Sequence, residues 1–167
     1  MKRILILGCP GSGKSTASKK LSQKLNIPVI HLDRLFWREG WTNVSREEFD
    51  TLLEAELEKD EWIIDGNYSR TIPVRLERAD TAVFFDYPTV TCFWRVIKRV
   101  ITKHGVSRSD MENNCPERFD FEFLLYVARF RKSQRKMILG FLENSSADVI
   151  IVHNKKEYAE FENKFLK

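Results

Sequence analysis

The residues best able to do chemistry stand close to the N-terminus, where three glycines surround a lysine and two serines. Residues 8–15 read Gly-Cys-Pro-Gly-Ser-Gly-Lys-Ser and match the pattern G-x-x-x-x-G-K-[ST] in full. Glycines let a backbone curl until successive N–H groups point at one anion, and a helix that begins directly afterwards adds its positive end. The pattern predicts a nucleotide phosphate site made of Gly8, Pro10, Gly11, Ser12, Gly13, Lys14, Ser15 and Thr16.

Two residues of this loop have separate expected roles. Lys14 is expected to reach the β and γ phosphates of ATP, and the Ser15 hydroxyl is expected to bind Mg²⁺. Thr16 either contacts the α phosphate or packs within the following helix, and the sequence leaves both interpretations open.

Three aspartates follow apolar runs that have the pattern of buried strands. We expect Asp65 to hold Mg²⁺ together with Ser15, by way of water. Asp33 follows the apolar run at 29–32, where an aspartate often caps a turn. Asp86 begins an Asp-Tyr-Pro turn and fits a structural role equally well.

The elements that must position these residues alternate along the whole chain. Short apolar runs predict five strands, at 4–7, 29–32, 62–64, 81–85 and 149–152. Amphipathic spacing predicts helices at 14–25, 45–57, 72–79, 90–101, 121–142 and 156–166. This alternation indicates an α/β fold, with a parallel sheet covered on both faces in one domain spanning 1–167. Ligands of such sheets bind beyond the carboxyl ends of the strands, where the aspartates stand.

The composition bounds the kind of protein. The chain has 167 residues, 43% hydrophobic and 31% charged, and no apolar run approaches the roughly 18 residues that cross a bilayer. Three scattered cysteines fit neither a disulfide framework nor a zinc site. We therefore expect a cytoplasmic protein without a membrane partner, either a monomer or a homodimer. Residues 95–136 carry 11 Lys/Arg against 5 Asp/Glu, which fits either nucleic acid or a phosphate-rich small ligand.

Several stretches together resemble one family, the topology modulation proteins, which are small bacterial ATP-binding proteins related to adenylate and nucleoside monophosphate kinases. They are the loop at 8–15, Asp33, the Trp37…Gly40-Trp41 patch, Trp-Ile-Ile-Asp-Gly-Asn-Tyr at 62–68 and the segment 79–86. The resemblance implies a P-loop NTPase fold with a five-stranded parallel sheet in the order 2-3-1-4-5. It also implies an acceptor-binding segment at about 33–60 and a short lid at about 104–120.

The kinase resemblance gives further residues an expected role. Lys14, Asp33, Arg99 and Arg108 are the expected catalytic group, the arginines offsetting charge on the transferred phosphoryl oxygens. Related kinases place a carboxylate at the position of Asp33, which implies that it accepts the proton of an acceptor hydroxyl or orders the Mg²⁺ shell, if it is not simply a turn cap. Trp37 and Trp41 either stack on an acceptor base or pack the following helix onto the sheet. Arg70 either binds the acceptor or is an ordinary solvated arginine, because it stands one residue further from Asp65 than the matching arginine of adenylate kinases and lacks the preceding proline.

Two functions remain open at this point. The first is an ATP-dependent small-molecule kinase, which transfers the γ-phosphoryl group to an unidentified acceptor of nucleotide or nucleoside type. The second is a nucleic-acid-associated ATP-binding protein that influences DNA topology without kinase activity. A GTPase fits poorly, because no D-x-x-G pattern follows the third predicted strand.

Overall fold

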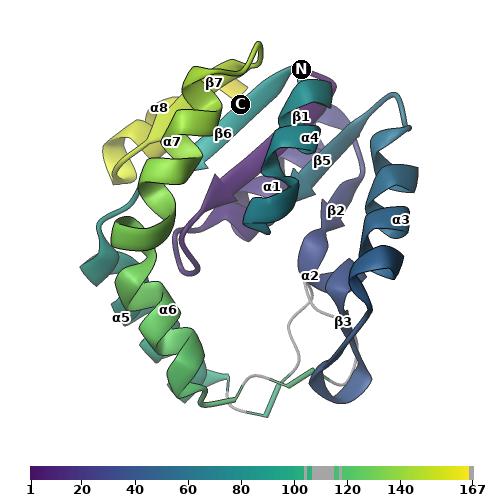
Figure 1. Cartoon of the computed structure of the whole chain (residues 1–167). Helices are drawn as coiled ribbons and strands as arrows, with labels where there is room; N and C mark the ends of the chain where they lie inside the picture. The colour runs from purple at the N-terminus through teal and green to yellow at the C-terminus, as the bar shows by residue number, and fades with distance from the viewer. Residues whose placement is uncertain (104, 107–114, 117, 166–167) are drawn as a thin grey trace.

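A five-stranded parallel sheet forms the centre of the computed structural model, which describes residues 1–103, 105–106, 115–116 and 118–165 (Figure 1). From one edge to the other the strands are β2 (Val29–His31), β5 (Trp62–Asp65), β1 (Arg3–Gly8), β6 (Thr81–Phe85) and β7 (Asp148–Val152). Every pairing between these neighbours is parallel. Numbered along the chain, this order is 2-3-1-4-5, so the predicted fold class and strand order are confirmed.

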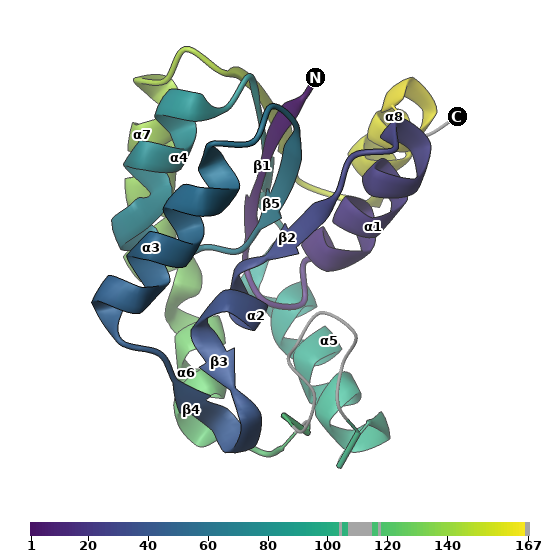
Figure 2. The ribbon, with the colours of Figure 1, turned by 90° about the vertical axis from the view of Figure 1, so that its right-hand side faces the viewer.

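The sheet is covered on both faces (Figure 2). One face carries α1 (Lys14–Leu25) and α8 (Lys155–Phe165), and the other carries α3 (Arg46–Leu57), α4 (Ile72–Arg78) and α7 (Lys136–Glu143). Because both faces are covered, β1 is fully buried from Ile4 to Leu7, as its unbroken apolar run predicts. Across the described ranges, no helix is long and apolar enough to cross a membrane.

Two further helices extend past the carboxyl ends of the strands. These are α5 (Thr89–Thr102) and α6 (Phe121–Phe130), which pack against each other (Figure 1). Their position lets them form a wall beside the strand ends, which is the place where ligands of parallel sheets bind.

The second predicted strand is shorter than the sequence suggests. β2 ends at His31, and Leu32–Phe36 form a short helix, α2. His31 pairs with Asp65, the last residue of β5, so the residues after His31 have no neighbouring strand to pair with. Asp33 therefore lies in the first turn of α2 rather than at the end of a strand, which corrects the prediction for this segment.

Two irregular elements were absent from the prediction. Between α2 and α3 the chain forms a small antiparallel hairpin of β3 (Trp37–Arg38) and β4 (Thr42–Asn43), joined by η1 (Glu39–Trp41). Strands of two residues are too short to show an alternating pattern. The single helix expected at 121–142 is α6 followed by a π-helical turn, η3 (Arg131–Arg135), and then α7.

Candidate active site at the strand ends

The phosphate loop connects β1 to α1 with the tight backbone that its glycines predict. Gly11 has φ +83°, and a Cβ added there would lie only 2.5 Å from the carbonyl oxygen of Cys92 in α5. Gly13 has φ +104° and is the N-cap of α1. A side chain at Gly11 would thus strain the backbone and push the loop away from α5, so both the curl and the close packing require glycine.

Two side chains hold this loop from outside. The Nη1 group of Arg95 donates to the carbonyls of Gly11 at 3.3 Å and Ser12 at 3.2 Å. Asn67 accepts the N–H of Gly8 at 3.0 Å and donates to its carbonyl at 2.9 Å. Asn67 follows β5 and Gly8 ends β1, so these two hydrogen bonds join the loops after two neighbouring strands. The sequence offered no signal for Asn67 beyond its place in the resemblance.

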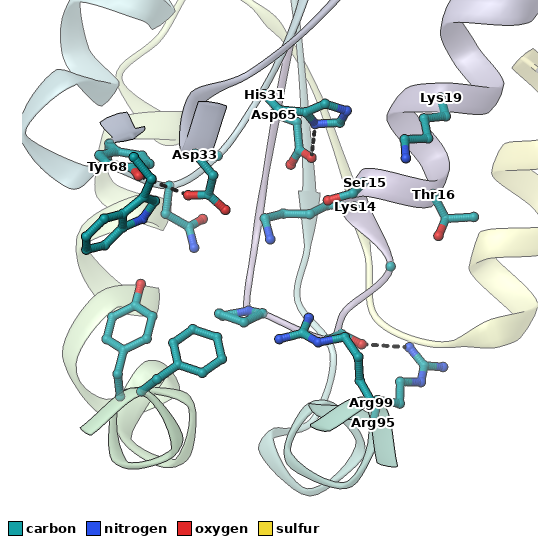
Figure 3. A pocket seen from close by; sticks show the side chains of 18 of the residues that line it. Lys14, Ser15, Thr16, Lys19, His31, Asp33, Asp65, Tyr68, Arg95 and Arg99 are labelled. Atoms are coloured by element: carbon teal, nitrogen blue, oxygen red, sulfur yellow. Dashed lines mark hydrogen bonds and ion pairs between the residues drawn. The ribbon is translucent and has the colours of Figure 1, made fainter. Parts of the chain in front are cut away.

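A cavity of about 1340 Å³ opens beside the loop (Figure 3). Ligand pockets hold one drug-sized molecule in about 300–1,000 Å³, so this cavity has room for two ligands side by side. We divide its lining by the elements that supply it. The nucleotide half comprises the lining residues of the phosphate loop, α1, α5 and the turn after α5: Pro10, Gly11, Gly13, Lys14, Ser15, Thr16, Lys19, Lys20, Gln23, Arg95, Arg99, Lys103 and Val106. The acceptor half comprises those of α2, the β3–β4 hairpin, the loop after β5, α6 with the residues before it, and η3: Asp33, Trp37, Trp41, Asn67, Tyr68, Ser69, Arg118, Asp120, Phe123, Tyr126 and Gln134. His31, Asp65 and Gly66 line the boundary between the halves.

A buried carboxylate stands at this boundary. Asp65 is 4% exposed, and its Oδ2 contacts the Nδ1 of His31 at 3.0 Å (Figure 3). In the described part of the chain, Oδ1 of Asp65 is buried without a hydrogen-bond partner, and so is the Ser12 hydroxyl. An orphaned carboxylate oxygen beside a phosphate loop fits a hydrated Mg²⁺, and an orphaned hydroxyl fits a phosphate oxygen. Ser15, the other expected Mg²⁺ ligand, lines the same cavity.

Among the described residues, no group of three or more His, Cys, Asp or Glu side chains could hold a metal ion.

The carboxylate of Asp33 faces the acceptor half. Its Oδ1 accepts a hydrogen bond from the Tyr68 hydroxyl at 2.9 Å (Figure 3). Burial, together with the nearby negative charge of Asp33, raises the pKa of Tyr68 well above its usual range, so the hydroxyl stays a donor. Tyr68 has φ +35°, an uncommon conformation for a large residue, and this places strain directly at the site.

A buried arginine fixes the backbone that carries Tyr68. Arg75 of α4 is 0% exposed and donates to the carbonyls of Gly66 at 2.8 Å and Tyr68 at 3.1 Å, and also to that of Asn67. Burial lowers the pKa of Arg75, and the carbonyl contacts compensate for the lost hydration of its charge. Sequence reasoning missed Arg75, because an arginine in an amphipathic helix normally reads as a surface residue.

The remaining expected site residues separate into three groups. Trp37 and Trp41 line the acceptor half, with ring centroids 5.6 Å apart, and Arg99 lines the nucleotide half, above the Phe123 ring. Arg70 is not brought to the cavity, because both of its terminal nitrogens bind Asp50 of α3 on the surface. Arg108, with most of the expected lid at 104–120, lies outside the described residues.

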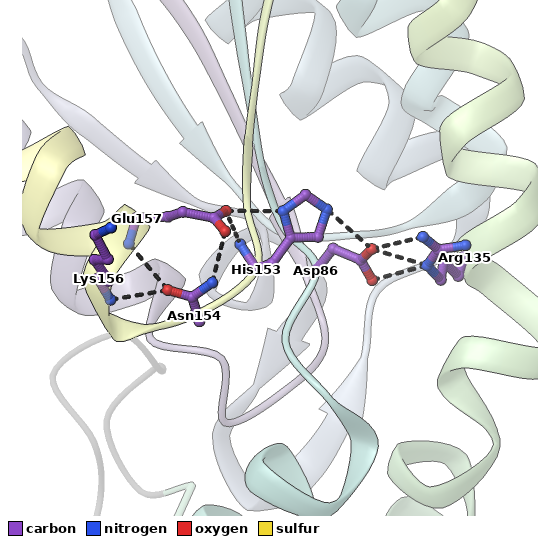
Figure 4. A network of polar contacts seen from close by, with 6 residues as sticks. All are labelled: Asp86, Arg135, His153, Asn154, Lys156 and Glu157. Atoms are coloured by element: carbon purple, nitrogen blue, oxygen red, sulfur yellow. Dashed lines mark hydrogen bonds and ion pairs between the residues drawn. The ribbon is translucent and has the colours of Figure 1, made fainter.

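Asp86, left open by the sequence, joins a network beside the cavity (Figure 4). Its buried carboxylate accepts from Nε of Arg135 at 2.9 Å and lies 2.8 Å from Nη2 of the same residue. The carboxylate also lies 3.8 Å from Nε2 of His153. Arg135 belongs to the π-helical turn η3, so Asp86 ties this turn to the end of β6. Within the described network, Asp86 thus has a structural role.

Comparison with known proteins agrees with this architecture. A family model described as AAA domain matches residues 4–120. An adenylate kinase from Ruminiclostridium cellulolyticum is 35% identical over 65 residues, which cover 38% of this chain and 30% of that protein. A putative adenylate kinase from Pyrococcus abyssi is 29% identical over 118 residues, covering 66% of this chain and 60% of that protein. The match thus spans less than two thirds of the length of these relatives.

Solved structures share the fold at low sequence identity. A shikimate kinase from Acinetobacter baumannii, solved in complex with shikimate, superposes with a TM-score of 0.62 at 16% identity and covers 99% of this chain and 91% of its own. A shikimate kinase from Bacteroides thetaiotaomicron gives a TM-score of 0.59 at 18% identity, covering 98% and 95%. The family match over residues 4–120, with a phosphate loop at the end of a 2-3-1-4-5 parallel sheet, shows that the chain belongs to the AAA domain family of P-loop proteins and has a kinase-like fold.

Proposed function

We propose that this chain is an ATP-dependent kinase that transfers the γ-phosphoryl group to a small acceptor of nucleotide or nucleoside type. The observation that supports it most is the division of one cavity into two halves. The half around the phosphate loop carries Lys14 and Arg99, and the half opposite presents the Asp33 carboxylate. A cation-rich pocket for polyphosphate beside a separate pocket with a base is the arrangement that in-line phosphoryl transfer needs.

Each group then has a defined task. The loop N–H groups and Lys14 bind and orient the phosphates, and Arg99 offsets charge that develops on the transferred group. Asp33, held by Tyr68, accepts the proton of the acceptor hydroxyl. Ser15 and Asp65 are the side chains that would hold Mg²⁺, which supplies neutralisation of phosphate charge when it is bound.

The basic surplus of residues 95–136 does not support a nucleic-acid surface. Arg95 is bound to loop carbonyls, Arg135 is bound to Asp86, and Arg118 lies over the Trp41 ring at 5.0 Å. Binding to nucleic acid needs arginines that are available to phosphates on one face. These three arginines instead have partners within the fold.

Turnover with an acceptor panel tests the proposal. ADP release from ATP and Mg²⁺ should rise when one acceptor is added, and Lys14→Ala should abolish the rise. As a control, Lys132→Ala changes an exposed residue outside the cavity and should leave it intact. If no small acceptor stimulates ADP release while duplex DNA does, the kinase proposal is wrong.

We also infer, from residues 62–68 and the Trp37…Trp41 patch, that the chain is a topology modulation protein. Any effect on DNA topology would then be indirect, because cutting DNA requires a nucleophilic tyrosine and a strand gate. We expect the purified protein with ATP and Mg²⁺ to leave the linking number of a supercoiled plasmid unchanged on a gel. A shift in topoisomer distribution would contradict this inference.

A further inference from the structure

The two halves of the cavity differ sharply in charge. The nucleotide half contains six cationic side chains and no carboxylate among the described residues. The acceptor half contains two carboxylates, Asp33 and Asp120, and among its described lining residues one cation, Arg118, while Arg99 of the nucleotide half lies at its edge, above the Phe123 ring. That guanidinium lies over Trp41 and 3.9 Å from Asp120, so its charge is partly offset. This half is unfavourable for a second phosphate group.

Two further arginines close to this half, Arg70 and Arg75, have other partners. Arg70 makes a two-point ion pair with Asp50 on the surface and does not line the cavity. Arg75 is fully buried, and its guanidinium N–H groups donate hydrogen bonds to backbone carbonyls. Phosphate recognition in proteins usually depends on guanidinium groups that can bind it in two places at once. Neither arginine meets that condition.

Aromatic rings dominate the rest of the acceptor half. Trp37 and Trp41 come from the β3–β4 hairpin with centroids 5.6 Å apart, and Phe123 and Tyr126 come from α6 with centroids 6.5 Å apart. Trp41 has φ +63°, and its Nε1 donates to the Pro116 carbonyl at 3.2 Å. A strained backbone that holds a large ring in a cavity suggests a binding role. Such walls suit a flat ring.

One neutral amide is fixed at the edge of this aromatic pocket. The Ser69 hydroxyl donates to Oε1 of Gln134 at 2.6 Å, and this bond leaves the NH₂ group of Gln134 as the end able to donate to a ligand. Gln134 lies in the π-helical turn, and the next residue, Arg135, is anchored by Asp86 (Figure 4). Single π-helical turns within α-helices are frequent at functional sites.

We propose that the acceptor is an uncharged nucleoside rather than a nucleoside monophosphate, and this rests on the kinase function proposed above. Its base lies against the aromatic walls, a base carbonyl accepts from Gln134, and a sugar hydroxyl faces Asp33. The hydroxyl oxygen bonds to the γ phosphorus as the bond from that phosphorus to the β–γ bridging oxygen breaks. ADP leaves with the electron pair, and the hydroxyl proton passes to Asp33.

A panel of paired acceptors tests whether the substrate is an uncharged nucleoside. The full chain, with ATP and Mg²⁺, is given the common ribo- and deoxyribonucleosides, each paired with its 5′-monophosphate, and also shikimate and an amino alcohol. We expect at least one nucleoside to raise ADP release, with a kcat/KM at least tenfold above that of its monophosphate. Mass spectrometry should show a phosphorylated nucleoside. The inference is overturned if a monophosphate, shikimate or the amine is the better acceptor, whereas the kinase proposal then stands. If no acceptor of any class acts, both are overturned.

Variants at Gln134 separate recognition from folding. Gln134→Leu should raise the KM for the nucleoside at least tenfold and leave the KM for ATP unchanged, whereas Lys132→Gln on the same exposed turn should change neither. An unchanged melting temperature shows that the Gln134→Leu variant is folded. Tryptophan fluorescence gives a readout without turnover, because a nucleoside bound at Trp37 and Trp41 should change the emission in the presence of a non-hydrolysable ATP analogue. No change with any nucleoside would overturn the inference.

Discussion

Replacing Asn67 with alanine tests whether one amide holds together the loops after β1 and β5. Asn67 makes two hydrogen bonds with Gly8, at 3.0 and 2.9 Å. Neutral hydrogen bonds contribute about 1 kcal/mol each, so Asn67→Ala should lower the free energy of unfolding by about 2 kcal/mol. In a chain of 167 residues, this corresponds to a fall in Tm of about 4–8 °C.

The same substitution should weaken nucleotide binding, because Gly8 is the first residue of the phosphate loop. A loss of about 1 kcal/mol in loop organisation would raise the Kd for a non-hydrolysable ATP analogue about fivefold. Urea unfolding measures the first effect, and calorimetric titration with Mg²⁺ present measures the second. As a control, Asn144→Ala removes a side-chain hydrogen bond to the Gly140 carbonyl on the surface of α7 and should change stability by about 0.5 kcal/mol at most. If Asn67→Ala behaves like Asn144→Ala in both assays, the reasoning is refuted.

Three other predictions concern the charged and titrating groups of the cavity. Lys14→Ala should eliminate the calorimetric heat of ATP binding, because it removes the ammonium group at the phosphates; a retained heat would place the nucleotide elsewhere. Asp65→Asn can still contact His31 but loses its charge, so the Mg²⁺ concentration for half-maximal turnover should rise at least about tenfold, and an unchanged Mg²⁺ dependence would exclude Asp65 as a ligand. Burial raises the pKa of Tyr126 from 10.0 to about 12, so the folded protein favours the neutral hydroxyl. The contribution of this group to the free energy of unfolding is therefore fully present below pH 10 and is lost as the pH rises through 12. Urea unfolding across that range should show a smaller loss in Tyr126→Phe, and an equal loss would contradict the assignment.

The phosphate loop and the sheet could be predicted from sequence because each leaves a dense local pattern. The spacing of Gly8, Gly11 and Gly13 before Lys14 has few structural solutions, and the five short apolar runs, alternating with amphipathic segments, favour buried strands. The order of the strands came from the family resemblance rather than from the residues. The strand order is confirmed by the parallel pairings of β2 with β5, β5 with β1, β1 with β6 and β6 with β7.

The acceptor half was predicted less well, because its residues are brought together by tertiary contacts. Asp33 was expected at a strand end, yet the missing neighbour beyond Asp65 lets a helix begin at Leu32. Gln134 lies in a π-helical turn that has the same amphipathic spacing as ordinary helix, and its partner Ser69 is 65 residues away. Arg70 was expected at the acceptor by analogy, and only the structure shows Asp50 beside it.

The hydrogen bonds from Arg75 to the carbonyls of residues 66–68 determine which side of the cavity can adapt to a different ligand. With its guanidinium enclosed and bonded to consecutive peptide units, that side moves only together with α4. The β3–β4 hairpin has two-residue strands and is held by single contacts, among them Arg38 to Glu48 and Trp41 Nε1 to the Pro116 carbonyl, rather than by one buried guanidinium. Evolution of a new acceptor preference should therefore proceed through substitutions in residues 37–43. Residues 66–68 should stay nearly unchanged, because they set the distance between the phosphate donor and the acceptor.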